Sequence, residues 1–314
     1  MGEINIGLLP KKDFGLPPST RCGHAQEGNI KKEGEILYII ILYRQNLREC
    51  KAYQTLLHDR KNVYIHDNSP IGKDYSPMGE NVSPIASAPD DLPEGWVYVS
   101  DPSNPGLSAA YNAAARYARE HRFKWLMITD QDTAYAAGAG DRYENLPSEY
   151  PEEKVFMPRV SIPGGMYISP VKKRFYMARP QAVPEDGRVR LDKTAVINSG
   201  LMVSVDAFER SGGYNEKVFL DFSDYQFIDR LAEISPYGRV TEEETRQSFS
   251  ANDDKGDARL NRFGLFCRSL AGYDKKRLAT RLGIGMAAMK RTLSLAIGLR
   301  SMKPFEIFLK NYII

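Results

Sequence analysis

The chain has 314 residues, of which 42% are hydrophobic and 26% are charged, and its formal net charge is +3. This balance is typical of a folded globular protein, and it excludes disordered, collagen-like and disulfide-scaffold classes. The 3 cysteines share no CxxC spacing, so neither a cysteine zinc site nor a disulfide framework is expected. A reducing cytosol is therefore the simplest compartment.

Residues 1–34 contain three prolines and six glycines without hydrophobic periodicity, which predicts a flexible tail. They also contain no apolar run of signal-peptide length, so we expect no secretion signal. The apolar run over 36–43 predicts a buried strand, and a helical pattern follows over 46–58. A second short strand, VYIHD, ends at Asp67.

Prolines divide the next part of the chain. Seven of the 19 fall within 70–105 and seven more within 147–184, and each stretch predicts a long loop. A strand begins at Trp96, after which Asn104 is predicted to cap a helix with Pro105 at its first position. Another strand covers 125–129. The helix between these strands has one apolar face, formed by Leu107, Ala110, Tyr111, Ala114, Tyr117 and Ala118.

This alternation of strands and helices predicts an open α/β sheet with parallel pairing. Ligands of such sheets bind at the carboxyl ends of the strands, which points to Asp67 and to the TDQDT segment with Asp130 and Asp132. Two carboxylates two residues apart suit a divalent cation of the Mg or Mn type, which also takes phosphate oxygens. A simple polar turn at the end of the strand is the alternative.

A second acidic cluster lies in VFLDFSDYQFIDRL, where a loop enters a predicted helix. Asp221 and Asp224 are three residues apart, so they can share one face, and a base beside a metal-held phosphate is a sensible pair. The alternative is that Asp224 only caps the helix. Asp229, further along, is expected to be a surface charge.

Three blocks in matching order resemble a known family. They are NPGLSAAYNAAARYA, KWLMITDQDT and INSGLMVSVDAFERSGGYNEKVFLDFSDYQFIDRL. They resemble family 2 glycosyltransferases of the GT-A fold, particularly the bacterial rhamnosyltransferase-like branch, over about 36–230. The resemblance implies an α/β fold, a Rossmann-like open mixed sheet, over 35–255. The flexible tail 1–34 precedes it, and a basic helical extension follows over 256–314.

The resemblance also implies roles for individual residues. Asp132 would ligate a divalent metal, and either Asp221 or Asp224 would be the catalytic base. Gln247 stands where many relatives carry a metal-binding His, which implies a looser hold on the metal. The residues implied to bind the nucleotide sugar are Asp67, Asn104, Gly106, Asn112, Asp130 and Gly200.

The implied activity is that of a metal-dependent inverting hexosyltransferase in the cytoplasm. Its donor would be a UDP- or dTDP-sugar, and its acceptor a bacterial surface polysaccharide or glycolipid. Two rivals remain open. A nucleotidyltransferase would normally show a glycine-rich basic motif, which YRQNLRECK lacks. A non-catalytic scaffold that binds a nucleotide sugar would have kept the fold alone.

The end of the chain is basic. From Lys275 onward there are nine Lys and Arg and one acid, so this segment carries +8 and the rest carries −5. This asymmetry argues against nucleic-acid binding and indicates a local contact with something anionic. Two interpretations stay open: a basic amphipathic helix on the inner face of the cell membrane, or a helical cap on the domain. The residues spaced along one face are Leu278, Leu282, Met286, Met289, Leu293 and Ile297.

Overall fold

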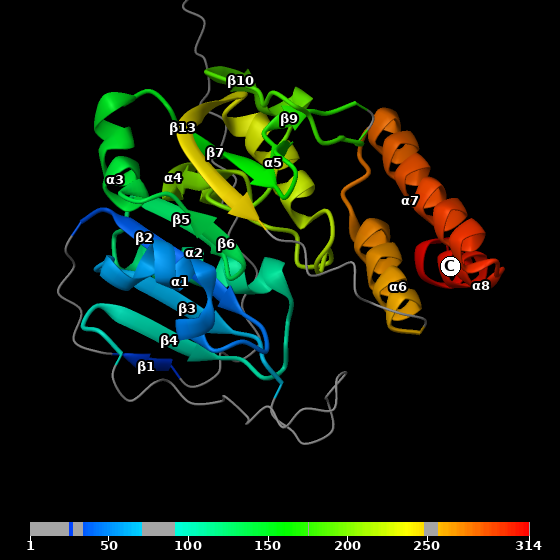
Figure 1. The fold of residues 1–314 in the computed structure, drawn as a ribbon, viewed down its shortest axis with the longest axis horizontal. Helices are drawn as coiled ribbons and strands as arrows, with labels where there is room; N and C mark the ends of the chain where they lie inside the picture. Colours follow the sequence, from blue (N-terminus) through cyan, green and yellow to red (C-terminus); the bar gives the residue numbers. More distant parts are fainter. Residues whose placement is uncertain (1–24, 28–33, 71–91, 175, 248–256, 314) are drawn as a thin grey trace, which may run out of the picture.

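Four parallel strands form one half of a large mixed sheet (Figure 1). The structure is a computed structural model that describes residues 25–27, 34–70, 92–174, 176–247 and 257–313. The predicted parallel α/β sheet is confirmed within these ranges. The four strands are β2 (Ile36–Leu42), β3 (Val63–Asp67), β4 (Trp96–Ser100) and β5 (Trp125–Asp130).

The other half of the sheet mixes directions. Strand β12 (Met202–Ser204) runs antiparallel between β5 and β7 (Val155–Ile162), and β13 (Tyr237–Gln247) runs parallel to β7. The remaining strands are short. They are β1 (Ala25–Glu27) on β4, β6 (Thr133–Tyr135) and β10 (Arg188–Arg190) on β13, β8 (Met166–Ser169) on β7, and the separate pair β9 (Val171–Lys172) and β11 (Thr194–Ala195).

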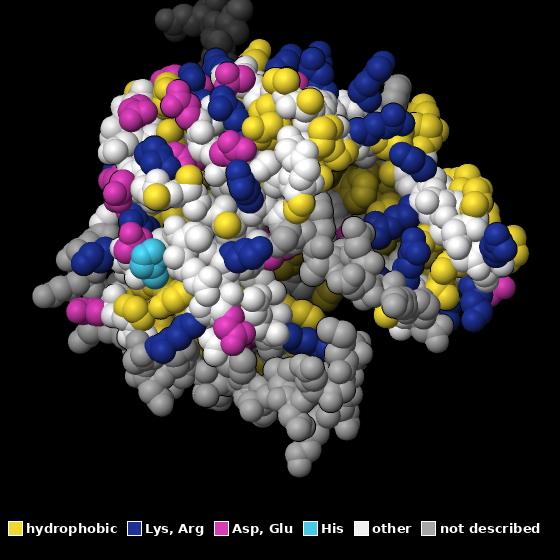
Figure 2. Space-filling model, in the orientation of Figure 1, with side chains coloured by type: hydrophobic (Ala, Val, Ile, Leu, Met, Phe, Trp, Pro, Cys, Tyr) yellow, Lys and Arg dark blue, Asp and Glu magenta, His cyan; other side chains and the backbone are white. Residues whose placement is uncertain are grey.

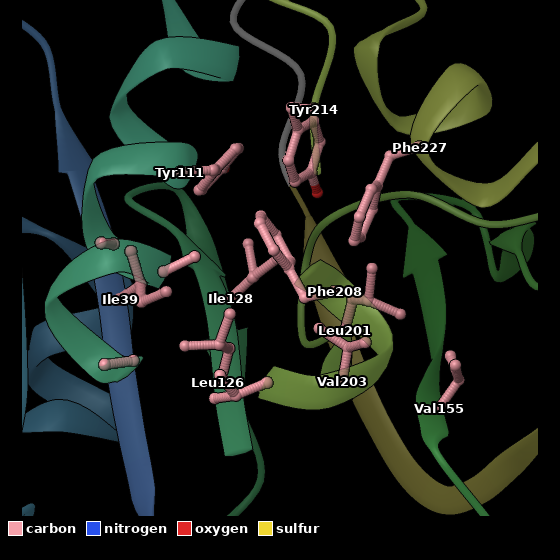
Figure 3. Packing of buried hydrophobic residues seen from close by; sticks show 14 of the residues in the cluster. Ile39, Tyr111, Leu126, Ile128, Val155, Leu201, Val203, Phe208, Tyr214 and Phe227 are labelled. Atoms are coloured by element: carbon pink, nitrogen blue, oxygen red, sulfur yellow. The ribbon is translucent and has the colours of Figure 1, made fainter. Parts of the chain in front are cut away.

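Helices pack on both faces of the sheet. Alternate residues of β2 divide between two cores, as the period of a strand requires: Ile39 belongs to one, and Tyr38 and Ile40 belong to the other. In Figure 3, which shows the first core, the ring of Tyr214 lies between Tyr111 and Phe227. The helices of the first core are α2 (Leu107–Glu120), α4 (Val205–Arg210) and α5 (Ser223–Ile234), and those of the second are α1 (Lys51–Thr55) and α3 (Ala139–Glu149).

The carboxyl-terminal helices form a third core beside the sheet (Figure 1). Phe263, Phe266 and Leu270 of the first helix pack with Ile284 of the second, and Val218 from the sheet domain joins them. The predicted helical extension is therefore present, and it is attached to the body. Its elements are α6 (Asp257–Gly272), α7 (Leu278–Leu299), α8 (Lys303–Phe308) and a π-helical turn, η4 (Leu309–Ile313).

The helix expected over 46–58 is broken into three pieces. Cys50 and Leu56 leave the helical conformation and bury their side chains in the second core, which interrupts the helix on both sides of α1. The short flanking turns are η1 (Leu47–Glu49) and η2 (Leu57–Asp59), and a third such turn, η3 (Leu191–Lys193), precedes β11.

The two proline-rich stretches differ from the prediction. The stretch 147–184 is not one loop, because it contains β7, β8 and β9. Pro158 fits within β7 because the β7–β13 register shifts at this point, between Val240 and Glu244, where a regular ladder would need its missing N–H. In the stretch 70–105, β4 is described, whereas 71–91 lie outside the described residues.

The amino-terminal prediction also needs one correction. Ala25–Glu27 form an edge strand that pairs antiparallel with β4, although they fall in the segment predicted to be a flexible tail. Residues 1–24 and 28–33 lie outside the described residues.

Candidate active site

Strands β3 and β5 lie on either side of β2, and both β3 and β5 end in an aspartate. Leu42 of β2 pairs with Asp67 of β3, and Ile41 pairs with Asp130 of β5. Because parallel strands end at the same edge of a sheet, both carboxylates lie at the edge where such folds bind ligands. Asp132 follows two residues beyond β5, at the start of β6.

Asp130 is held by two hydroxyl groups. Tyr111 of α2 donates to Oδ1 at 3.3 Å, and Ser199 donates to Oδ2. Burial raises the pKa of Asp130, the bond from Ser199 opposes the increase and the nearby Asp132 carboxylate adds to it, which together bring the pKa to about 6. The sequence analysis did not single out Ser199, although it lies in the NSGL block that carries the resemblance.

Asp132 lies next to Gln247, as the resemblance implied. Strand β13 pairs with β6 so that Gln247 is opposite Thr133, and Gln247 Nε2 donates to Asp132 Oδ1 at 3.4 Å. Burial raises the pKa of Asp132, and this hydrogen bond opposes the increase. The Gln247 Oε1 atom is buried and has no hydrogen-bond partner among the described residues.

These oxygens fit a divalent cation. Mg²⁺ and Mn²⁺ prefer oxygen ligands, and Mg²⁺ usually takes only one or two carboxylates from the protein, with phosphate and water completing the shell. The Oε1 atom of Gln247, which has no hydrogen-bond partner among the described residues, and the carboxylate of Asp132 are two oxygen ligands of this kind. Within the described ranges no three His, Cys, Asp or Glu residues are placed to hold a metal ion together, so substrate phosphates would have to complete the coordination.

Asp221 and Asp224 have different surroundings. Asp221 Oδ1 accepts a hydrogen bond from Arg262 of α6 at 3.0 Å, which ties the loop to the helical extension. Asp224 lies in the first turn of α5, where Tyr225 N–H donates to its Oδ1 at 2.7 Å. Burial, with a smaller contribution from the carboxylates of Asp130 and Asp221, raises the pKa of Asp224 to about 7, while the hydrogen bond from Tyr225 N–H opposes the increase. A carboxyl group with a pKa near 7 is suited to act as a base near neutral pH, as Asp224 is.

The start of α2 holds the loop that carries these acids. Gly106 has φ +94°, and a Cβ atom there would lie 2.6 Å from Phe219 Cδ2 and 2.8 Å from Phe219 O. Leu107 N–H donates to Phe219 O at 3.2 Å, and the Ser108 hydroxyl donates to Val218 O at 2.6 Å. This close approach requires glycine and fixes the segment that leads to Asp224.

We expect substitution of Gly106 by alanine to destabilise the protein by about 3 kcal/mol. The new Cβ adds the strain of a conformation that side chains disfavour, about 1–3 kcal/mol, to the cost of overpacking against Phe219, about 1–3 kcal/mol. Urea denaturation measures the change in the free energy of unfolding.

Gly164 provides the matched control for this substitution. Its φ is +98°, but nothing lies within 4 Å of its Cβ position. Gly164→Ala carries the backbone strain alone. It should therefore destabilise the protein less than Gly106→Ala does, by a difference of at least about 1 kcal/mol. Equal losses for the two variants would show that contact with Phe219 contributes nothing.

Two of the predicted site asparagines, Asn112 and Asn104, lie in and before helix α2. Asn112 is buried, donates to Tyr214 O and Glu216 Oε1 and accepts from Tyr214 N–H, so it anchors the loop before Val218. Asn104 does not cap α2, because it has φ +48° and the cap position is Gly106, which must approach Phe219.

Asp67 and Gly200 are buried and make close contacts within the chain. Asp67 is buried, and its oxygens accept hydrogen bonds from the Tyr98 hydroxyl at 2.5 Å and from Ser69 N–H at 2.8 Å. Gly200 is buried with φ +84°, and a Cβ there would lie 2.5 Å from Pro158. Only glycine fits this position, which follows Ser199 directly in the chain.

Asp229 is not a surface charge. It accepts hydrogen bonds from Lys173 Nζ at 2.8 Å and from the Tyr273 hydroxyl at 2.7 Å. These partners come from the segment after β9 and from the end of α6, and no local pattern in the sequence could indicate either contact. Asp229 therefore joins three parts of the chain.

A cavity of about 550 Å³ lies beside the Asp132–Gln247 pair. Its volume falls in the range of sites for small molecules. Lys51 contributes a positive charge from α1, next to Asp132, whose pKa it lowers. The other polar side chains of the lining are Ser161, Tyr167, Glu244, Arg246 and Gln247.

Comparison with known proteins supports the fold. No family model matches this chain, and no curated protein matches its sequence. GalNAc-T7, in a crystal structure with UDP, GalNAc and Mn²⁺, superposes with a TM-score of 0.51 at 9% identity over 78% of this chain. The match covers 48% of GalNAc-T7, so this chain spans about half of it. S. aureus TarS 1–349 gives a TM-score of 0.47 at 11% identity, over 89% of this chain and 80% of that one.

At such identities the likeness concerns the fold alone. The mixed sheet with its helical extension is a GT-A fold, and the fold class expected from the sequence is confirmed.

Proposed function

We propose that this protein is a metal-dependent glycosyltransferase that transfers a hexosyl group from a UDP- or dTDP-sugar with inversion at the anomeric carbon. The observation that carries the proposal is that Asp130 and Asp132 lie at the carboxyl edge of a GT-A sheet and that the charge of Asp130 acts on Asp224 in the first turn of α5. Asp130 interacts with both other carboxylates and raises the pKa of Asp224. The UDP and Mn²⁺ in the GalNAc-T7 structure support a nucleotide donor and a divalent cation.

Asp132 and Gln247 are the residues that would hold the cation. A bound divalent cation would neutralise the charge that develops on the nucleoside diphosphate leaving group. The protein's own part is to keep the Asp132 carboxylate and the Gln247 amide oxygen together at one end of β13. Lys51, which lines the adjacent cavity, adds a positive charge for phosphate oxygens.

Asp224 is the proposed catalytic base. Its carboxylate accepts the proton of an acceptor hydroxyl as that oxygen bonds to the anomeric carbon of the donor. The bond from that carbon to the diphosphate oxygen breaks in the same displacement, which inverts the configuration. Asp130, positioned by Tyr111 and Ser199, would orient the hydroxyl groups of the donor.

The two rival functions lack a comparable observation. A scaffold that only binds a nucleotide sugar has no use for a half-buried carboxyl group with a pKa near 7, such as that of Asp224. In a nucleotidyltransferase, a substrate oxygen attacks phosphorus. This class of reaction does not imply a base that deprotonates an acceptor hydroxyl. We therefore assign the acceptor hydroxyl to Asp224 and propose a bacterial surface polysaccharide or glycolipid as the acceptor.

The transfer rate should depend on pH through Asp224. The carboxyl group accepts a proton only when ionised, and its pKa is about 7, so the rate should rise with pH and reach half its plateau near pH 7. Release of nucleoside diphosphate from a panel of UDP- and dTDP-hexoses, followed from about pH 5 to about pH 9, measures this profile. A rate that is constant over this range, or that rises on acidification, contradicts the role of Asp224.

We further propose that helix α7 places the enzyme at the cytoplasmic face of the membrane. Six of its apolar side chains form an exposed stripe, with exposed fractions from 39% to 76% (Figure 2). Among the described helices, α7 alone is long and apolar enough to cross a membrane, and 33% of its apolar stretch is buried within the protein. Its opposite side packs in the third core, and Arg281 and Lys290 are exposed, which favours a helix lying on an anionic surface. The stripe comprises Leu278, Leu282, Met286, Met289, Leu293 and Ile297.

A charge placed in the stripe should weaken binding to lipid vesicles. Burial of a leucine side chain contributes about 1.5–3 kcal/mol, so Leu282→Asp should lower the affinity for phosphatidylglycerol vesicles roughly tenfold to 100-fold in co-sedimentation. Val183→Asp is the matched control, since Val183 is an exposed apolar residue outside α7. Equal losses for both variants contradict a role for the apolar stripe, and equal binding of the wild type to uncharged vesicles contradicts a role for the basic residues beside it.

A further inference from the structure

A strongly basic cavity lies between the segment that follows β8 and helix α7. Its volume is about 670 Å³, within the range of sites for small molecules. Four of its six lining side chains are cations and none is an acid. In Figure 2, dark-blue side chains gather between the body and α7. The lining residues are Lys172, Arg174, Met177, Arg179, Gln181 and Lys290.

The positive charge in this cavity is largely uncompensated. Lys172 lies 3.9 Å from Glu185, at the limit of an ion pair. Arg174, Arg179 and Lys290 are exposed, and none forms an ion pair with a carboxylate of the described residues. Cations kept close together without acids repel one another, and a bound anion relieves that repulsion.

The walls of the cavity are bonded to helices α5 and α7. Lys173, between two of the lining cations, donates to Asp229 of α5 at 2.8 Å and lies 5.8 Å from the centre of the Tyr225 ring. Tyr176 shares a hydrogen bond of 2.9 Å with Thr280 of α7. The cavity is therefore attached to the helix whose first turn carries Asp224, on one side, and to the helix with the apolar stripe, on the other.

We propose that this cavity binds the phosphate or diphosphate group of the acceptor substrate. The inference rests on the proposed glycosyltransferase function, because a wall of the cavity is bonded to α5, the helix that carries the base that activates the acceptor. Arginine and lysine are the residues that hold phosphate oxygens by charge-assisted hydrogen bonds, and arginine can do so with two parallel bonds. Lys290 belongs to both the cavity and α7, so an acceptor with an apolar chain would place its phosphate in the cavity and its chain along the stripe.

Binding of inorganic pyrophosphate and of farnesyl diphosphate tests the proposal. Both are titrated calorimetrically into Asp132→Ala protein with EDTA present, so that the metal-dependent nucleotide site does not contribute. Replacing Arg174 and Lys290 by glutamine in that background should weaken both ligands roughly tenfold to 100-fold. Lys303→Gln, which removes an exposed lysine of α8 outside the cavity lining, should leave both affinities unchanged.

The outcomes separate this proposal from the proposed function. Tighter binding of farnesyl diphosphate than of pyrophosphate assigns the site to a lipid-attached phosphate, and equal affinities assign it to a soluble one. No binding, or the same loss in Lys303→Gln as in the double variant, overturns the cavity assignment. A metal-dependent stabilisation of the wild type by UDP or dTDP, measured in parallel, reports on the proposed function independently of these titrations.

Discussion

Replacing Asp224 by asparagine should lower the transfer rate by about 10² to 10⁴-fold, the usual contribution of a general base. The amide keeps the shape of the side chain but cannot accept the proton. Nucleotide binding should persist, because the substitution leaves Asp132 and Gln247 in place. Initial rates and equilibrium binding of the nucleoside diphosphate, measured on the same preparation, separate the two effects.

Two other aspartates serve as comparisons. Asp206→Asn changes an exposed residue of α4 and should have the activity of the wild type. Asp221→Asn weakens the bond to Arg262 and should reduce the thermal stability of the attached helices, with a much smaller effect on rate than Asp224→Asn. An inactive Asp221→Asn together with a fully active Asp224→Asn would reverse the assignment of the base.

Replacing Asp132 by alanine should lower kcat by about 100- to 1,000-fold, the cost of losing one stabiliser of charge in the transition state. The dependence of activity on Mn²⁺ should disappear with it, because the remaining acceptor, Gln247, is a neutral amide. The measurement is kcat as a function of Mn²⁺ concentration for both proteins.

Gln247 offers a test in the opposite direction. Its amide lies 3.4 Å from Asp132 Oδ1, so Gln247→His would place an imidazole, a good ligand for transition metals, at the same position. The concentration of Mn²⁺ needed for half-maximal activity should fall. An unchanged Mn²⁺ requirement in both Asp132→Ala and Gln247→His contradicts a metal site at this pair.

Local patterns predicted the elements that carry the first half of the site. Continuous apolar runs indicated β2, β3, β4 and β5, because strands buried on both faces contain few polar residues. Ligands of open α/β sheets bind at the carboxyl ends of the strands, so the predicted strands were enough to indicate Asp67, Asp130 and Asp132 from the sequence. The apolar face of α2 was likewise predicted from helical spacing, and its alanines are buried.

The remainder depends on contacts between distant parts of the chain. Gly106 and Phe219 approach each other, and Asp221 pairs with Arg262, yet neither pair is marked by any spacing in the sequence. Strand β7 was missed because Pro158 argues against a central strand unless the register shift beside it is known. The difference between Asp221 and Asp224 arises from burial and neighbouring charges, which only the folded chain determines.

The most direct test of a metal-dependent nucleotide site is a thermal-shift measurement. UDP, dTDP and GDP are added to the wild type, each with Mn²⁺ or with chelator. A ligand at about 100 times its dissociation constant stabilises a protein by about 2.7 kcal/mol, which is readily detected. We predict a shift with UDP or dTDP that requires Mn²⁺ and is absent in Asp132→Ala. The absence of a shift with every nucleotide, or a shift that persists in chelator, would contradict the account.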